Sequence, residues 1–418
     1  MKMIRLRYLA KVNPSTPAFS RMSDENRLTF LPMESVWPGL RLDTSQHRRK
    51  REVAVGYTRF QDGDLLVPKI TPTFEAGRAV LIEGLLGGVG AGTTELHVIR
   101  PGERVDPRFL FYVVNTRDFL KLGKSEMYGV AGQQRVPDEF LRDFLVPVPS
   151  VNEQRRISTF LDAEIARIER LIGARGRMAS LLELKKDRLA AEILGLEASE
   201  RKDLTPLKYI VSGVTVGIVI TPAKWYTDSG GVPALRGLNV RPGSIDSEGL
   251  VRISARGHAE NLKSRLAEGD VVVVRTGQAG AAAVVPAELA GANCIDLIIL
   301  RPGERVVPRY LEYVLNSNHV RSRVIEHSVG SIQAHFNVSA MKRIAIPKLS
   351  REEQCEVVER LDVKVESIET LRRKFVRQQA LLTERRQALI TAAVTGQFDV
   401  STASGRNVTD VTDGVTRV

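Results

Sequence analysis

The chain has 418 residues and a formal net charge of +12, from 61 lysines and arginines against 49 aspartates and glutamates. This length allows two or three domains, and the positive excess favours a polyanionic partner such as nucleic acid. Only two cysteines occur, and no run of 18 apolar residues is present, so the sequence argues against a disulfide framework, a cysteine-based zinc site and a membrane protein. We therefore expect a cytoplasmic protein.

An internal repeat organises the chain. RPGERVDPRFLFYVVNT, residues 100–116, returns 201 residues later as RPGERVVPRYLEYVLNS, residues 301–317, and 12 of the 17 aligned positions are identical. The matches continue outward, from LRYL near the start and its counterpart LKYI as far as Leu189 and Leu389. Two complete copies of one structural plan are expected, because extended self-similarity marks duplicated units.

The first part of each copy, residues 1–149 and 203–349, is predicted to be a mixed α+β domain. Both parts contain short β-branched runs between glycines and prolines, such as DLLV, ELHVI, DVVVV and CIDLIIL. A helix is predicted late in each, over DPRFLFYVVN and VPRYLEYVLN. Residues 11–62 and 212–268 align poorly, so the two domains are expected to differ there.

The second part of each copy, residues 150–196 and 350–397, is predicted to be one long helix. Both open on a capping box of the form Ser-x-x-Glu, and both reach a glycine that is expected to end the helix. Gly173 and Gly176 put the straightness of the first helix in doubt. The polar tail, residues 398–418, is expected to be disordered.

Apolar residues in the two long helices recur at intervals of three, four or seven, which predicts a coiled-coil-like seam. If the helices pack antiparallel, the chain returns along the second helix and the domains lie at opposite ends of a rod with a pseudo-two-fold axis. The predicted seam consists of Leu161, Ile165, Ile168, Ile172, Leu182, Leu189, Leu361, Val365, Ile368, Phe375, Leu382 and Leu389.

Three kinds of segment are candidates for contacting DNA. The run HRRKR has no helical or strand period and could neutralise phosphates. The loops after the two Gly-Asp turns, and one cluster in each copy just before the terminal strand and long helix, carry side chains able to pair with base edges. These candidates are Arg48, Arg49, Lys50, Arg51, Lys69, Thr71, Thr73, Gln133, Gln134, Arg135, Arg275, Thr276, Gln278, Gln333, His335 and Asn337. For each of them an ordinary exposed or structural role is the alternative.

The order of the motifs resembles a known family. GDLLVPKITPTFEAGRAVLI, GDVVVVRTGQAGAAAVV, LVPVPSVNEQRRISTFLD, IAIPKLSREEQCEVVERLD and ERRQALITAAVTGQFDV together resemble the specificity subunit of Type I restriction-modification systems. The resemblance implies an α+β fold in which two mixed α/β target recognition domains are separated by two long antiparallel coiled-coil helices.

The same resemblance implies a non-enzymatic subunit that reads an asymmetric, bipartite DNA site and docks two adenine-methyltransferase subunits on its helices. A restriction and translocation subunit is a further expected partner. S-adenosylmethionine, ATP and magnesium would belong to those partner subunits, and this chain would hold no cofactor or metal.

Two other functions stay open at this point. The loose pattern of a metal-dependent nuclease is matched by Asp138, Glu183 and Lys185. However, Glu183 and Lys185 are two residues apart on a predicted helix, so their side chains face different directions. A coiled-coil architectural protein that binds DNA without sequence preference is the other alternative.

Overall fold

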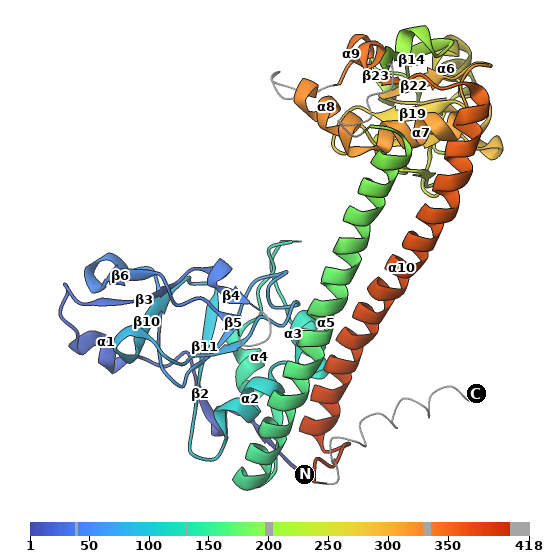
Figure 1. The fold of residues 1–418 in the computed structure, drawn as a ribbon. Helices are drawn as coiled ribbons and strands as arrows, with labels where there is room; N and C mark the ends of the chain where they lie inside the picture. Colours follow the sequence, from blue (N-terminus) through green and yellow to red (C-terminus); the bar gives the residue numbers. More distant parts are fainter. Residues whose placement is uncertain (38–40, 131, 197–203, 329–335, 402–418) are drawn as a thin grey trace. The chain divides into compact units, whose positions relative to one another are not determined.

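The computed structural model describes residues 1–37, 41–130, 132–196, 204–328 and 336–401, which fold into two compact units (Figure 1). Unit 1 comprises Met1–Arg175 and Arg377–Val418, and unit 2 comprises Gly176–Val376. Unit 1 is therefore assembled from both ends of the chain, whereas unit 2 is one continuous stretch.

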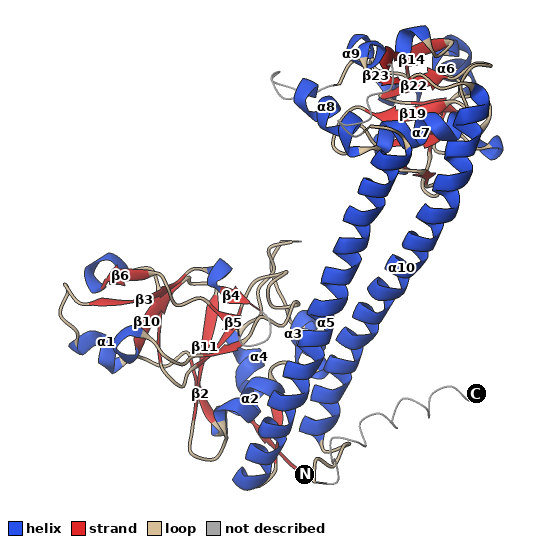
Figure 2. Ribbon diagram, viewed as in Figure 1, coloured by secondary structure: helices blue, strands red, loops and turns tan. Residues whose placement is uncertain are grey.

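Unit 1 is a mixed helix and strand structure (Figure 2). Its shorter helices are α1 (Pro17–Arg21), α2 (Pro107–Val113), α3 (Arg117–Ser125) and α4 (Asp138–Asp143). Its strands are β1 (Lys2–Arg5), β2 (Ala10–Val12), β3 (Arg27–Leu31), β4 (Val36–Trp37), β5 (Arg41–Leu42), β6 (His47–Arg49), β7 (Thr58–Gln61), β8 (Leu65–Pro68), β9 (Val80–Leu81), β10 (Val89–Gly92), β11 (Leu96–Pro101) and β12 (Leu145–Val148).

Unit 2 has the same mixed character. Its shorter helices are α6 (Ala255–Glu260), α7 (Pro308–Asn316), α8 (Asn318–Ser328) and α9 (Val338–Arg343). Its strands are β13 (Leu204–Pro206), β14 (Gly213–Val216), β15 (Val232–Leu235), β16 (Val240–Arg241), β17 (Ser244–Ile245), β18 (Val251–Ile253), β19 (Val271–Val274), β20 (Ala282–Val284), β21 (Asn293–Cys294), β22 (Leu297–Arg301) and β23 (Ala345–Pro347).

The two units share one framework. In unit 1 the order β2-β11-β8-β9 forms an antiparallel sheet, and unit 2 repeats it as β14-β22-β19-β20. A second antiparallel pair, β1 with β12, recurs as β13 with β23. The strands LLVP of β8 and VVVV of β19 are buried throughout, as expected for apolar runs in the centre of a covered sheet.

The remaining sheets are similar but not identical in the two units. Unit 1 has the four-stranded order β6-β3-β10-β7, with β3 and β10 parallel, and unit 2 has the three-stranded order β18-β15-β21, with β15 and β21 parallel and, among the described residues, no counterpart of β7. A short hairpin adds β4 and β5 in unit 1 and β16 and β17 in unit 2. Apart from β10 and β21, these strands fall within residues 11–62 and 212–268, the stretches that align poorly in sequence.

Two long helices, α5 (Val151–Ile193) and α10 (Arg351–Thr395), follow the two domains. The backbone amides of Glu153 and Glu353 donate to the hydroxyls of Ser150 and Ser350, at 3.3 and 3.2 Å, so the expected N-caps are present. Helical hydrogen bonding continues without interruption through Gly173 and Gly176 in α5.

Both long helices end on a glycine in the left-handed conformation. Gly195 has a φ of 65° and Gly396 a φ of 75°, a backbone region that side chains with a Cβ rarely adopt. The amide of Leu196 donates to the carbonyl of Ala191 at 2.9 Å, which satisfies one of the last free carbonyls of α5. Both long helices therefore end at the glycines that the sequence predicts.

The two long helices run antiparallel in each unit. In unit 1 Glu169 pairs with Arg386, and the Gln379 amide donates to the Ile172 carbonyl at 3.3 Å. In unit 2 Lys186 pairs with Glu369 at 2.6 Å. Among the predicted seam residues, Leu161, Ile168, Leu361 and Ile368 are buried, and Ile165, Ile172, Leu182, Leu189, Val365, Phe375, Leu382 and Leu389 are half-buried.

The core of each unit takes part of both long helices. In unit 1 the domain packs on the start of α5, through Ile157 and Leu161, and on the end of α10, through Ile390 and Val394. In unit 2 the corresponding contacts come from the start of α10 and the end of α5. Each unit therefore combines one domain with the beginning of its own helix and the end of the other.

Candidate nucleic-acid interface

The basic run at 48–51 in unit 1 is ordered, contrary to the expectation of an irregular stretch. His47–Arg49 is β6, paired antiparallel with β3, and the following residues form a 3-10 turn. Arg49 and Arg51 both pair with Glu25, and Lys50 lies 3.1 Å from Asp24 and donates to the Met22 carbonyl. The sequence prediction missed these acidic partners because they lie about 25 residues earlier in the chain.

Arg48 differs from its three basic neighbours. Its guanidinium lies 3.7 Å from the centre of the Phe30 ring, and its Nη1 donates to the Tyr57 hydroxyl at 3.3 Å. Within the described residues it pairs with no carboxylate. Stacking on an aromatic ring limits the freedom of the side chain while leaving its charge uncompensated, which suits a phosphate contact.

The loop after the Gly63-Asp64 turn and the cluster before α4 lie together in unit 1. Thr71 and Gln134 exchange two hydrogen bonds, from the Thr71 amide at 3.0 Å and from the Gln134 amide to the Thr71 hydroxyl at 3.2 Å. The Val136 amide donates to the Lys69 carbonyl at 2.9 Å. The hydroxyl of Thr73 instead donates to the Ile70 carbonyl within its own turn.

The two cationic groups of this cluster have different partners. Arg135 holds Glu95 in a forked pair, with its Nη2 and Nε atoms at 2.7 and 2.9 Å from the two carboxylate oxygens, and these hydrogen bonds lower the pKa of Glu95. Lys69 donates to the Thr94 carbonyl at 2.8 Å, and burial lowers the pKa of its ammonium group. Gln133 is exposed.

His97 is buried beneath the same cluster. Its Nε2 lies 2.9 Å from the Val136 carbonyl, and its Nδ1 lies 3.2 Å from the Asn13 amide nitrogen. These partners suit a neutral ring that donates through Nε2 and accepts through Nδ1. Burial lowers the pKa of His97 to about 4.

Unit 2 repeats the arrangement with different side chains. Arg275 occupies the place of Lys69, donates to the Phe336 carbonyl at 2.9 Å and pairs with Asp296 at 2.5 Å. Asp296 precedes β22 as Glu95 precedes β11, so each cluster has one acid at the same position. Thr276 and Gln278 are exposed beside Arg275.

Of the three candidates before α9, Asn337 lies within the described residues. Asn337 is the N-cap of α9, because its side-chain oxygen accepts from the Ala340 amide at 2.8 Å. Its acceptor is therefore engaged in a structural contact. Gln333 and His335 lie outside the described residues.

Each unit also has a hollow beside its shared sheet that no sequence pattern indicates. In unit 1 it has a volume of about 980 Å³, and Arg21, Arg59 and Lys69 are among its lining residues. In unit 2 it has a volume of about 710 Å³, and Lys224 and Trp225 help to line it. Both hollows are bordered by the segment that follows the first sheet strand, where the two units diverge most.

The repeated stretch that begins at Arg100 makes structural contacts within each unit. Arg100 pairs with Asp64 at 2.7 Å, and Arg301 pairs with Asp270 at 3.4 Å, so each joins the Gly-Asp turn to the sheet. The buried side chain of Gln154 accepts from the Asp106 amide at 2.8 Å and donates to two carbonyls, and Gln354 makes the same three contacts.

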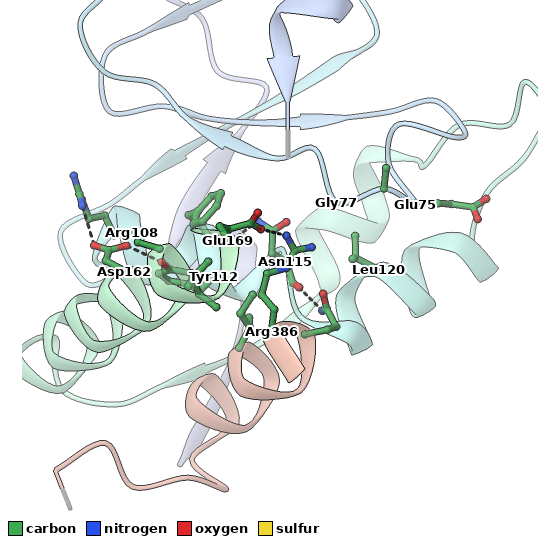
Figure 3. A pocket seen from close by; sticks show the side chains of 15 residues that line it. Glu75, Gly77, Arg108, Tyr112, Asn115, Leu120, Asp162, Glu169 and Arg386 are labelled. Atoms are coloured by element: carbon green, nitrogen blue, oxygen red, sulfur yellow. Dashed lines mark hydrogen bonds and ion pairs between the residues drawn. The ribbon is translucent and has the colours of Figure 1, made fainter. Parts of the chain in front are cut away.

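A cavity of about 450 Å³ in unit 1 lies beside this framework, between α2, α5 and α10 (Figure 3). On its wall Arg108 and Tyr112 both point to Asp162, at 2.8 and 2.7 Å. Burial raises the pKa of Tyr112, so its hydroxyl stays protonated. In unit 2 Arg309 and Tyr313 hold Asp362 in the same way.

The residues of the nuclease pattern have other partners. Asp138 pairs with Arg142 at 2.9 Å inside α4, and Glu183 pairs with Lys186 at 2.6 Å. No group of three or more metal-ligating side chains occurs among the residues that the structure describes. In the same residues, no helix has the length and apolar character needed to cross a membrane.

Comparison with known proteins confirms the predicted resemblance. No protein-family model matches the chain. The EcoEI specificity subunit of a Type I restriction enzyme from Escherichia coli is 39% identical over 158 residues, which are 37% of this chain and 26% of that protein. The EcoAI specificity subunit from the same organism is 38% identical over 153 residues, which are 36% of this chain and 25% of that subunit. These matches span about a quarter of the curated relatives' length.

Two solved structures share the fold. One, from work on complex assembly and conformational transition of the type I R-M system, has a TM-score of 0.74 at 18% identity and covers 95% of this chain and 98% of its own. The HsdS subunit from Thermoanaerobacter tengcongensis has a TM-score of 0.51 at 20% identity, covering 95% and 97%. The predicted α+β fold with two domains and long helices is therefore confirmed, and the chain's curated relatives are Type I specificity subunits.

Proposed function

We propose that this chain is the DNA-recognition subunit of a Type I restriction-modification complex and that each unit reads one half of an asymmetric, bipartite site. The observation that carries the proposal is a matched framework with divergent attachments. The sheet β2-β11-β8-β9 has its counterpart in β14-β22-β19-β20, whereas the second sheet has four strands in unit 1 and three in unit 2, and the hollows have different lining residues. A protein that reads two different sequences needs the same support and different contacts in each unit.

Docking of two methyltransferase subunits on the long helices is supported by exposed leucines at corresponding positions. Unit 1 exposes Leu171 and Leu381, and unit 2 exposes Leu371 and Leu181. Exposed apolar side chains that recur in this way suit two copies of one partner. In this proposal the partners hold S-adenosylmethionine, ATP and magnesium, and the chain itself performs no chemistry and acts in the cytoplasm, where the DNA lies.

The test is methylation by the assembled complex. The chain is co-expressed with its methyltransferase partner, and modified adenines are mapped across a genome. We expect one split, asymmetric sequence, and replacement of residues 1–149 by those of another specificity subunit is expected to change only one half of it. A continuous palindrome, or a change in both halves, contradicts the proposal.

The length of the long helices provides a second test. We propose that α5 and α10 set the unspecified gap between the half-sites. Seven residues, or two helical turns, are inserted at equivalent places of both helices. We expect a longer gap with both half-sites unaltered, and an unchanged gap rules out this role for the helices.

A further inference from the structure

Two exposed tyrosines occupy corresponding positions in the repeat. Tyr8 lies in the 3-10 turn η1 (Leu6–Tyr8) and Tyr209 in the turn η6 (Leu207–Tyr209), and their relative exposures are 66% and 65%. The turns are held alike, because the amides of Leu6 and Leu207 donate to the carbonyls of Phe144 and Ile344 at 2.9 and 2.8 Å. Both leucines are buried, so each turn directs its tyrosine outward.

A charged loop lies beside each turn. In unit 1 the Gly102 amide donates to the Leu9 carbonyl at 2.8 Å, which places Glu103 and Arg104 next to η1. Both side chains are exposed, and neither forms an ion pair within the described residues. Unit 2 has Glu304 and Arg305 at the corresponding positions, with the same exposure and likewise without an ion pair in that part of the chain.

Contacts inside the framework do not explain why this tyrosine, glutamate and arginine are identical in the two copies. Buried identities of the repeat, such as Gln154 with Gln354, make the same contacts inside each unit. The Tyr8 ring has no such role: no hydrogen bond of its hydroxyl and no aromatic partner occurs within the described residues. A large ring that is mostly exposed at the same place in both units points to one external contact made twice.

We propose that Tyr8, Glu103 and Arg104 in unit 1, and Tyr209, Glu304 and Arg305 in unit 2, form equivalent docking surfaces for two copies of one protein subunit. The inference rests on the proposed function, in which that subunit is the methyltransferase. The tyrosine is the anchor, because an aromatic ring with a polar end is typical of the residues that dominate binding energy. The two charged side chains supply the polar rim.

The charges favour a protein partner over DNA. Glu103 and Glu304 would repel phosphates, whereas a protein surface can place a cation opposite each of them. The cations beside the two tyrosines already have partners in their own units. Arg7, next to Tyr8, lies 2.5 Å from Asp143, and the Lys208 ammonium lies 4.6 Å from the centre of the Tyr209 ring.

The experiment measures how many methyltransferase subunits the full-length chain binds. Tyr8→Ala, Tyr209→Ala and the double variant are compared with wild type by native mass spectrometry, over a range of subunit concentrations. We expect each single variant to weaken one of the two binding events by roughly 30-fold or more, and the double variant to weaken both. Thermal unfolding verifies that the variants are folded.

Tyr128→Ala is the matched control. Tyr128 is 63% exposed in unit 1, and the corresponding stretch of the other copy, EHSVG, contains no tyrosine, so the control removes an exposed ring that is not repeated. It should leave both binding events unchanged.

The outcomes separate this inference from the proposed function. If wild type binds two subunits and methylates a split site while both single variants also bind two subunits with unaltered affinity, the inference is wrong and the function stands. If the variants keep both subunits but lose affinity for duplex DNA, the surfaces contact DNA and the inference is again wrong. A wild-type chain that binds no methyltransferase subunit overturns both.

Discussion

The Tyr112 hydroxyl donates a hydrogen bond of 2.7 Å to the Asp162 carboxylate, and through it a helix of the first domain is fastened to the start of α5. Tyr313 and Asp362 repeat the contact in unit 2 at 2.5 Å. We expect Tyr112→Phe to lower the free energy of unfolding of unit 1 by about 1–2 kcal/mol, because a hydrogen bond to a charged acceptor is lost. Tyr313→Phe should do the same for unit 2. Denaturant titration followed by hydrogen exchange measures the stability of each unit in both variants. If either variant destabilises the two units equally, the contact does not act within its own unit, which contradicts the prediction.

Gln154 should be more sensitive, since its buried side chain satisfies three backbone groups. Gln154→Leu leaves those groups without a partner, and we expect a loss of about 2–4 kcal/mol in the free energy of unfolding. Gln378→Leu, at an exposed position of α10, is the control and should change it by about 0.5 kcal/mol or less. A similar loss in both variants shows that the buried contacts are not the cause.

His97 predicts a pH dependence for unit 1. Its pKa in the folded state is about 4, below the ordinary value of 6.5, so the unfolded chain binds the proton more tightly. Stability from the neutral ring is complete above pH 6.5 and falls as the pH drops towards 4, by up to about 3 kcal/mol. His97→Gln cannot titrate, and its stability curve should be flatter across this range. Unit 2 has Ile298 at the corresponding position, and parallel curves for wild type and variant contradict the prediction.

Glu95 and Asp296 are expected to restrain binding to DNA of any sequence. Each pairs with an arginine of the candidate interface, at 2.7 and 2.5 Å. Glu95→Gln frees Arg135 and should add one phosphate contact, which steepens the dependence of log affinity on log salt by roughly 0.9. Asp296→Asn should act in the same way through Arg275. Salt titrations with a non-specific duplex measure the slope, and an unaltered slope in both variants removes this role.

Gln133 and Gln278 are candidates for reading bases, one in each unit, because both are exposed beside the clusters described above. A side-chain amide can pair with adenine through two hydrogen bonds. Gln133→Ala is expected to cost about 1–3 kcal/mol of discrimination at one position of one half-site, and Gln278→Ala at one position of the other. Methylation rates on single-base variants of the site give these values. Relaxation of the same half-site by both variants contradicts the division between the units.

The framework could be predicted from the sequence because its signals are local or repeated. The capping serines, the apolar spacing along α5 and α10, and the glycines at 195 and 396 all lie within a few turns of the feature that they determine. The repeat also fixes the register between the two copies, since residues 100–116 and 301–317 align without a gap.

The interface could not be predicted as well, because its contacts join distant segments. Thr71 meets Gln134 across 63 residues, and Arg135 meets Glu95 across 40. The sequence does not indicate the partners of the basic run, because nothing local shows that Glu25 neutralises two of its arginines. The hollows depend on side chains drawn from several loops, for which single-sequence patterns contain no signal.

Unit 1 also depends on the order in which the chain is made. Its core needs Ile390 and Val394, near the end of α10, whereas unit 2 is continuous from Gly176 to Val376. At a synthesis rate of about 5–20 residues per second, the first domain waits roughly 10–45 s for that helix to emerge. During this interval its apolar face is exposed on the nascent chain, and unit 2 can complete its own core first. The part of the protein that is translated first is therefore the part that finishes folding last.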